Sequence, residues 1–240
     1  MLSSLKEAYQ CALFQPSYLS IIVNPFYFAR KGLYQAIRDF SKNISGRILD
    51  VGCGNKPYQH LFSNSDYVGL EIDSPNNRKQ KQADYFYEGK VFPFEDSSFS
   101  TVVCNQVLEH IFEPKNLLTE INRCLQPGGT LLISVPFVWD EHEIPQDYAR
   151  YSSFGLRHLL EEANFQIVSH QKSVSDIRVV FQLLAAYIYK TYISNKNRFF
   201  SIFLTALLIC PVNLIGEILG IILPKNEALY LDNIILAKTL

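Results

Sequence analysis

The most constraining feature of the chain is a short apolar run, Ile48-Leu49-Asp50-Val51, that leads directly into Gly52-Cys53-Gly54. A continuous apolar run that ends at glycines is typical of a buried strand. Glycine lets the backbone adopt positive φ and lets a ligand approach the main chain, and Asp50 adds a hydrogen-bond acceptor at the end of the strand. The stretch therefore predicts an α/β protein that binds a small, nucleoside-bearing molecule at this strand end.

The spacing of the glycines bears on which nucleoside ligand is bound. The dinucleotide fingerprint has the pattern G-x-G-x-x-G, with a third glycine where helix and strand pack. In this chain that third position is Pro57, which has no N–H to donate to a phosphate. Pyrophosphate binding is therefore disfavoured, which leaves an NAD-dependent oxidoreductase as the weaker alternative.

Acidic residues follow the next two predicted strands. Glu71 ends the apolar run that begins at Tyr67 and lies 17 positions after Gly54. This is close to the spacing at which an acid at the end of a second strand reaches ribose hydroxyls. Glu88 follows the short run Tyr85-Phe86-Tyr87. Acids at successive strand ends suit a cationic adenosyl ligand better than a polyphosphate.

Several motifs in order carry a resemblance to a known family, namely ILDVGCG, YVGLEID, FPFEDSSFS, VLEH and LQPGGTLLISVP. Through them the chain resembles the class I S-adenosylmethionine-dependent methyltransferases of the methyltransferase type 11-like domain family, from about Arg47 to Val135. The resemblance implies a Rossmann-like, doubly wound, seven-stranded α/β sheet that is mostly parallel with an antiparallel last strand. It also implies S-adenosylmethionine as the cofactor.

The resemblance further implies which residues hold the cofactor. The amino-acid part would lie at the glycine turn, the ribose at the second strand end and the adenine at the third. The expected cofactor-binding residues are Asp50, Gly52, Cys53, Gly54, Glu71, Glu88, Gly89 and Asn105. The chain departs from the family pattern at Lys56, where a third glycine is usual, and at Ser100, where an Asp is usual.

The acceptor side of the site is expected after the fourth and fifth strands. The segment from Glu141 to Tyr151 is dense in polar and aromatic groups, as a substrate lid would be. Methyl transfer to a hydroxyl needs alignment and removal of a proton. The expected catalytic residues are His110, His142, Asp147 and Tyr151. The alternative is that Arg150 pairs with Asp147 and the tyrosines only pack.

A metal site is a second alternative at this place. Gln106 to His110, with the distant His142, is similar to the E-x-x-E-H…H arrangement that binds a divalent ion in some O-methyltransferases. Here the first Glu is replaced by Gln106, a neutral and poorer ligand, which leaves Glu109, His110 and His142 as donors. We expect no metal, and a structural hydrogen bond for His110.

The region from Ile177 to Pro224 is unusually apolar, so its helices must bury their surface against the core, a partner chain or lipid. The stretch from Phe199 to Leu223 is long enough to span a membrane, but we expect it to be interrupted at Pro211, Asn213, Gly216 and Glu217. This pattern favours a re-entrant or interfacial hairpin over a spanning helix. The predicted organisation is an N-terminal helical segment (1–45), the cofactor-binding core (46–176), the apolar helical insertion (177–224) and a closing strand (225–240).

Composition adds bounds on partners and location. The formal net charge of −1 gives no nucleic-acid footprint. The five cysteines form no C-x-x-C pair, and residues 1–15 lack a signal-peptide pattern. We therefore expect a cytoplasmic, or membrane-associated, enzyme that methylates a hydroxyl of a small or lipid-linked substrate, with membrane contact or a homodimer through the C-terminal helices. A cofactor-binding scaffold without activity is the non-enzymatic alternative.

Overall fold

The computed structural model describes residues 13–63 and 65–240, and the expectation about a signal peptide falls largely outside them. The chain divides into two compact units. The sheet unit comprises Ala36–Gln171 and Asn233–Leu240, and the helical unit comprises Met1–Gln35 and Lys172–Asp232.

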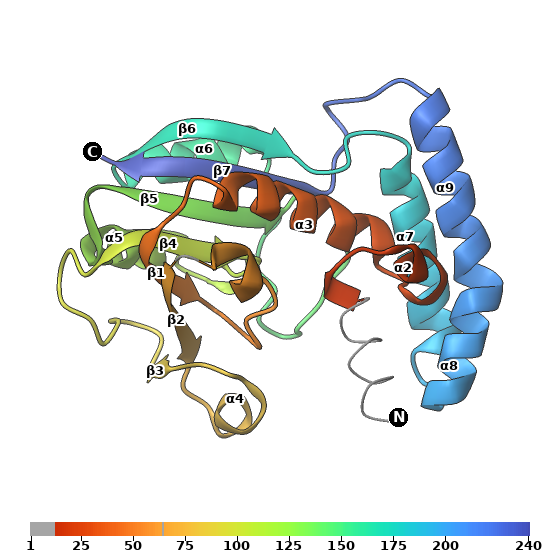
Figure 1. Ribbon diagram of the computed structural model, residues 1–240, viewed down its shortest axis with the longest axis horizontal. Helices are drawn as coiled ribbons and strands as arrows, with labels where there is room; N and C mark the ends of the chain where they lie inside the picture. Colours follow the sequence, from red (N-terminus) through yellow and green to blue (C-terminus); the bar gives the residue numbers. More distant parts are fainter. Residues whose placement is uncertain (1–12, 64) are drawn as a thin grey trace. The chain divides into compact units, whose positions relative to one another are not determined.

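The sheet unit is built on a seven-stranded sheet with the order β3-β2-β1-β4-β5-β7-β6 (Figure 1). Its strands are β1 (Gly46–Val51), β2 (Ser65–Ile72), β3 (Tyr85–Tyr87), β4 (Phe99–Asn105), β5 (Leu125–Pro136), β6 (Phe165–Lys172) and β7 (Asp232–Thr239). The pairs from β3 to β5 are parallel, and the last strands are antiparallel. The expected Rossmann-like sheet is thus confirmed.

The strand order places a topological switch point beside β1. The chain runs outward from β1 to β2 and β3, and then returns to the other side of β1 as β4. In open α/β sheets the ligand binds beyond the carboxyl ends of the strands at such a point. The glycine turn after β1 lies at this edge.

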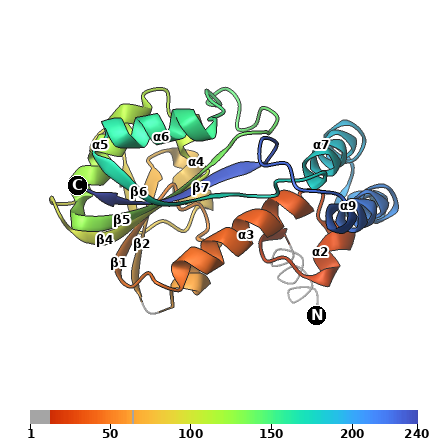
Figure 2. The same ribbon diagram turned by 90° about the horizontal axis from the view of Figure 1, so that it is seen from above.

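The central strands are buried on both faces, as parallel strands between layers of helices are. Ile48, Leu49, Val102 and Ile133 are fully buried. The helical elements of this unit are η1 (Gln59–Phe62), α4 (Pro75–Gln80), η2 (Leu108–His110), α5 (Pro114–Cys124) and α6 (Ser153–Glu162). Helices α5 and α6 cover one face of the sheet (Figure 2).

The helical unit contains α2 (Tyr18–Val23), most of α3 (Tyr27–Ser41) and a helical hairpin. The hairpin consists of α7 (Arg178–Ile188), a π-helical turn (Tyr189–Ile193), α8 (Arg198–Leu204), a second π-helical turn (Thr205–Ile209) and α9 (Cys210–Ile222). Helices α7 and α9 lie side by side (Figures 1 and 2).

The second arm of the hairpin is one continuous helix, Arg198–Ile222, of 25 residues. By length and composition alone it is long and apolar enough to cross a membrane. The expected interruption at Pro211 is wrong, because Pro211 stands in the first turn of α9 after the π-helical turn. There the N–H of Cys210 bonds to the carbonyl of Thr205, five residues back. Such a widened turn accommodates a proline without ending the helix.

Candidate active site

The glycine turn after β1 has the backbone that the sequence predicts. Gly52 and Gly54 have φ values of 67° and 53°. A Cβ on Gly52 would lie 2.4 Å from Cγ2 of Val107. The N–H of Gly52 donates to the carbonyl of Leu70 at 2.9 Å, which ties the turn to β2. Glycine is therefore required at position 52 for both conformation and space.

Glu71 is held at this turn by backbone donors. Its Oε2 accepts the N–H of Gly54 at 3.1 Å, and its Oε1 accepts the N–H of Ile72 at 3.2 Å. The carboxylate thus lies at the edge shared by β1 and β2, where the resemblance places ribose recognition. Glu88 and Gly89 follow β3 at the same end of the sheet and are exposed. Gly89 has a φ of 85°.

Asp50 is nearly covered by protein, with 6% of its surface exposed. Burial raises the pKa of its carboxyl to about 7, against the opposing effect of the hydrogen bond from the hydroxyl of Tyr67. That bond is 2.7 Å long. A buried carboxyl of this kind gains from a cationic ligand, because an opposite charge favours its ionised form. Tyr67 is a partner that the sequence analysis missed.

Lys56, the departure from the usual third glycine, has a structural role. Its backbone has a φ of 51°, and its ammonium pairs with Asp84 at 2.5 Å. Asp84 also accepts the N–H of Gly69 at 2.6 Å. A Cβ on Gly69 would lie 2.4 Å from Cε of Lys56, so the absence of a side chain on β2 gives the lysine its path.

The other departure, Ser100, lies at the opposite end of the central strands. Its hydroxyl donates to the carbonyls of Ser45 and Arg47 at 3.1 and 3.0 Å, at the start of β1. Both departures therefore brace the sheet. Cys53 is buried beside the turn, and burial raises the pKa of its thiol to about 12. It remains a neutral thiol at physiological pH.

The end of β4 continues toward the acceptor side. Asn105 accepts a hydrogen bond from the hydroxyl of Ser134 on β5. Gln106 follows with a φ of 56° and donates its N–H to the carbonyl of Ser134 at 3.0 Å. This kink turns the chain into η2, so Val107 contacts the glycine turn while His110 stands at the end of η2.

Two of the expected catalytic residues, His110 and His142, meet edge to face with ring centroids 4.8 Å apart. Nδ1 of His110 lies 2.8 Å from the carbonyl of Gln146, which is the structural hydrogen bond that the sequence analysis expects. Nδ1 of His142 lies 3.2 Å from the carbonyl of Asp140. Burial lowers the pKa of His142 below its ordinary value, so the ring is neutral at pH 7.

Asp147 and Arg150 form a two-point pair that frames His142. The guanidinium of Arg150 contacts both carboxylate oxygens of Asp147, at 2.6 and 2.7 Å. Asp147 also accepts the backbone N–H of His142 at 2.8 Å. The Arg150 pair holds the pKa of Asp147 well below its usual range. These contacts match the alternative in which the two residues pair, and they suit positioning rather than proton transfer.

Tyr151 packs at the edge of the sheet unit's core. Its N–H donates to the carbonyl of Pro136 at 3.2 Å, and its carbonyl accepts from Asn233 of β7 at 2.8 Å. Burial raises the pKa of its hydroxyl. The residues that precede Tyr151 form a small pocket, which is lined by Trp139, Glu141, Asp147, Tyr148, Ala149 and Arg150.

The candidate metal donors also come together. The ligand atoms of Glu109, His110 and His142 all lie within 4.8 Å of one another. Two imidazoles and one carboxylate form a donor set that divalent metals accept. Nδ1 of each histidine faces a backbone carbonyl, and Nε2 of His110 lies 3.9 Å from Oε1 of Glu109, which is too far for a hydrogen bond.

Comparison with known proteins gives the family. Residues 26–170, more than half of the chain, match the methyltransferase domain family. A tRNA U34 carboxymethyltransferase of Nautilia profundicola is 29% identical over 43% of this chain and 39% of its own length. A thiol S-methyltransferase of Mus musculus is 26% identical over 57% of this chain and 61% of its own length. The chain thus spans less than two thirds of these relatives.

Solved structures agree on the fold. A SAM-dependent methyltransferase from Archaeoglobus fulgidus has a TM-score of 0.55 at 17% identity and covers 93% of this chain and all of its own. The phosphoethanolamine N-methyltransferase 2 of Haemonchus contortus, in complex with S-adenosyl-L-methionine, has a TM-score of 0.56 at 16% identity. The match covers 86% of this chain and 52% of that structure's chain. The chain therefore belongs to the methyltransferase domain family, among the class I methyltransferases whose cofactor is S-adenosylmethionine.

Proposed function

We propose that this chain transfers the methyl group of S-adenosylmethionine to a hydroxyl oxygen of a small or lipid-linked acceptor. The observation that carries the proposal is the short path through η2. Val107, at one end, contacts the glycine turn, and His110, at the other, contacts the neutral ring of His142. A group that can accept a proton thus lies one helical turn from the cofactor edge.

On the cofactor side, we assign each expected residue to one part of the cofactor. Asp50 suits the cationic amino-acid part, together with the backbone of Gly52, Cys53 and Gly54. Glu71, oriented by two backbone N–H groups, accepts from the ribose hydroxyls. Glu88 and Gly89 flank the adenine, and Asn105 closes the edge at the end of β4. The bound cofactor supplies an activated methyl group on its sulfonium sulfur.

On the acceptor side, His142 acts as the general base. Both hydrogens of the Arg150 Nη2 group have partners that are nearer than Nδ1 of His142. These partners are the carbonyl of Asp140 at 2.6 Å and the carboxylate of Asp147 at 2.7 Å. Nδ1 of His142 therefore carries the proton that bonds to the carbonyl of Asp140. This tautomer leaves the Nε2 lone pair to take the hydroxyl proton of the acceptor.

The acceptor class rests on chemistry at this site and on the relatives. An O-methyltransferase of Aspergillus nomiae is 27% identical over 165 residues, which favours an oxygen atom as the methyl acceptor. The similarity to a thiol S-methyltransferase makes a sulfur atom the second candidate. The similarity to a tRNA U34 carboxymethyltransferase suggests a nucleic acid as another candidate substrate. The net charge of −1 supports a small or lipid-linked acceptor instead.

The test is incorporation of a radiolabelled methyl group into small-molecule and lipid extracts. His142→Ala should lower turnover about 100- to 10,000-fold, the usual contribution of a general base, with unchanged affinity for S-adenosylhomocysteine. His158→Ala, an exposed histidine on α6, is the matched control. Enzyme treated with a chelator should keep its activity. No labelled product in any extract, or full activity in His142→Ala, would contradict the proposal.

A further inference from the structure

Two polar side chains of the helical hairpin are fully buried inside the helical unit. Gln182 of α7 is fully buried, where it accepts the N–H of Ala29 at 3.1 Å and donates to the carbonyl of Pro25 at 3.0 Å. Asn213 of α9 is also fully buried and donates to the carbonyl of Ile21 at 2.9 Å. Each amide thus satisfies backbone groups of the N-terminal segment.

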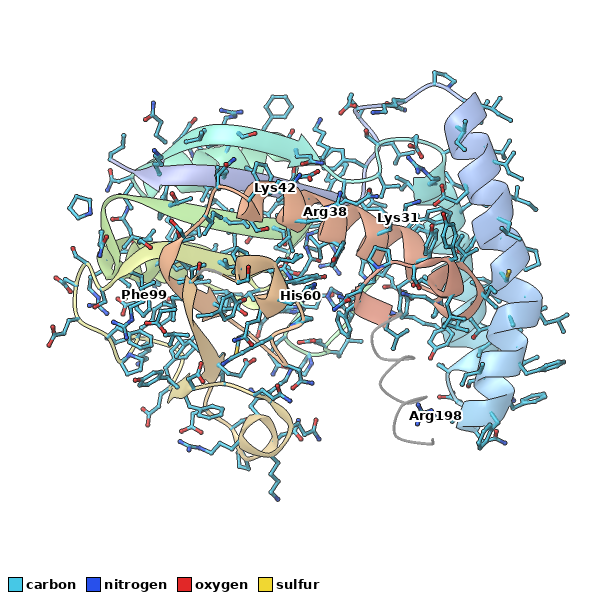
Figure 3. All side chains as sticks on the ribbon, in the orientation of Figure 1. Lys31, Arg38, Lys42, His60, Phe99 and Arg198 are labelled. Atoms are coloured by element: carbon cyan, nitrogen blue, oxygen red, sulfur yellow. The ribbon has the colours of Figure 1, made fainter. Side chains whose placement is uncertain are left out.

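The only charged residue between Arg198 and Lys225 also faces inward. Glu217 pairs with Lys31 at 2.5 Å and with Arg178 at 3.5 Å, and 19% of its side chain is exposed. Figure 3 labels Lys31 on α3 and Arg198 at the start of α8. The carboxylate that interrupts the apolar sequence is therefore neutralised within the unit and leaves the outer face of this helix without charge.

Small residues mark the packed side of α9. A Cβ on Gly216 would lie 2.6 Å from Cζ of Phe28, and one on Gly220 would lie 2.7 Å from Cδ of Arg178. These glycines are four residues apart, on one face of the helix. Small residues at this spacing let helices pack closely in membranes.

The outer face carries large apolar side chains instead. Tyr18 of α2, Phe199 of α8 and Ile221 of α9 are 93%, 83% and 82% exposed. Further exposed apolar residues of these helices and of α7 are Leu19, Ile22, Val180, Leu183, Leu184, Tyr187, Phe203, Leu207, Leu214, Ile215, Ile218 and Ile222. We call these residues the outer apolar face.

This arrangement is the reverse of an amphipathic helix in water, whose polar face is turned to solvent. In a bilayer, polar side chains face the protein interior and pair there, while apolar side chains face the lipid. We propose that the helical unit is seated in a lipid bilayer, with its outer apolar face against the hydrocarbon. The helix of 25 residues is about 37 Å long, which exceeds the roughly 30 Å of a hydrocarbon core.

The charge of the hairpin turn agrees with this partner. Lys190, Lys196 and Arg198 stand at the turn between the two arms, are exposed, and have no acidic residue among them in the sequence. Basic groups beside an apolar helix favour anionic lipid headgroups. In the proposed arrangement, the basic residues of the turn contact the phosphate headgroups, and the outer apolar face contacts the hydrocarbon.

The test is flotation of the full chain with vesicles of phosphatidylcholine, alone or mixed with phosphatidylglycerol. The protein should float with both and bind the anionic vesicles more tightly. Each basic residue near an anionic surface strengthens binding about fivefold. Replacing Lys190, Lys196 and Arg198 by Gln should therefore weaken the anionic preference on the order of 100-fold.

The apolar contact is tested by a matched pair of double variants. Leu207→Asp with Ile218→Asp should weaken flotation by more than about 50-fold, because an aspartate in hydrocarbon is costly. Phe154→Asp with Val168→Asp changes two apolar residues of the sheet unit that are at least about as exposed, and this variant should float as before. Retained binding of S-adenosylhomocysteine shows that the sheet unit of each variant is folded.

Two outcomes would overturn the proposal. One is a chain that stays in the lipid-free fraction as a uniform dimer and becomes monomeric as Leu207→Asp. That result would assign the outer apolar face to a second copy. The other is equal flotation of both double variants, which would remove the outer face from the lipid contact. Flotation needs no methyl acceptor, so its result is independent of the proposed activity.

Discussion

At the scale of single residues, we expect Glu71 to contribute most to cofactor recognition. Its carboxylate accepts the N–H of Gly54 at the strand end where we propose that the ribose binds. Glu71→Ala removes a charge-assisted acceptor worth about 1.5–3 kcal/mol. We expect the affinity for S-adenosylhomocysteine, measured by calorimetry, to fall roughly 10- to 150-fold. Glu161→Ala, an exposed acid on α6, is the control, and equal affinities in the two variants would refute the ribose assignment.

Asp50 makes a prediction about pH. Burial raises its pKa to about 7 in the folded protein, above the value of about 3.9 for an unfolded aspartate. The folded state therefore binds more protons between about pH 4 and about pH 7, so the free energy of unfolding falls as pH rises through that window. Asp50→Asn lacks this component and keeps an acceptor for Tyr67.

The measurement is urea denaturation of wild type and Asp50→Asn at about pH 5 and about pH 8. The stability of the variant relative to wild type should increase between the two. A difference that stays constant would mean that Asp50 is ionised throughout, as a solvated carboxylate would be.

At the scale of elements, α9 depends on close packing at its glycines. Gly216→Val places new atoms where a Cβ already lies 2.6 Å from Phe28 and 3.0 Å from Phe181. Overpacking of this kind costs about 1–3 kcal/mol, which lowers the melting temperature by roughly 2–12 °C. Ile215→Val, on the exposed side of the same turn, should leave melting by circular dichroism unchanged. Equal melting of the two variants would show that the glycine contact is not needed.

The elements of the sheet could be predicted from sequence because their signals are local. The apolar runs at Asp50 and before Glu71 are short and rich in strand-forming residues, and the first ends at glycines. The two strands, and the sheet edge that they share, could therefore be predicted. The continuity of Arg198–Ile222 could not be predicted, because the π-helical turn before Pro211 has no residue signature of its own.

The candidate site divides in the same way. The glycine turn and the acids at the strand ends could be predicted from the sequence, because backbone conformation and strand order determine where they lie. Contacts between distant loops were not, as with Lys56 and Asp84, 28 residues apart, and His110 with the carbonyl of Gln146, 36 residues apart. Only the folded chain shows that polar residues such as Gln182 face inward.

At the scale of the whole molecule, the protein contains a cofactor-binding sheet unit and a helical unit whose outer surface is apolar. The family match supports the first, and the burial of Gln182, Asn213 and Glu217 supports the second. Cofactor binding is the central claim, because the proposed general-base role of His142 requires a bound methyl donor.

The most direct test is calorimetric titration of the wild-type chain with S-adenosylhomocysteine and, separately, with NAD. The turn of Gly52 and Gly54, the buried Asp50 and the absence of a third glycine at Pro57 predict saturable binding of the first and none of the second. Gly52→Val, which would collide with Val107, should abolish binding. Binding of NAD, or failure of the folded wild type to bind S-adenosylhomocysteine, would contradict the account.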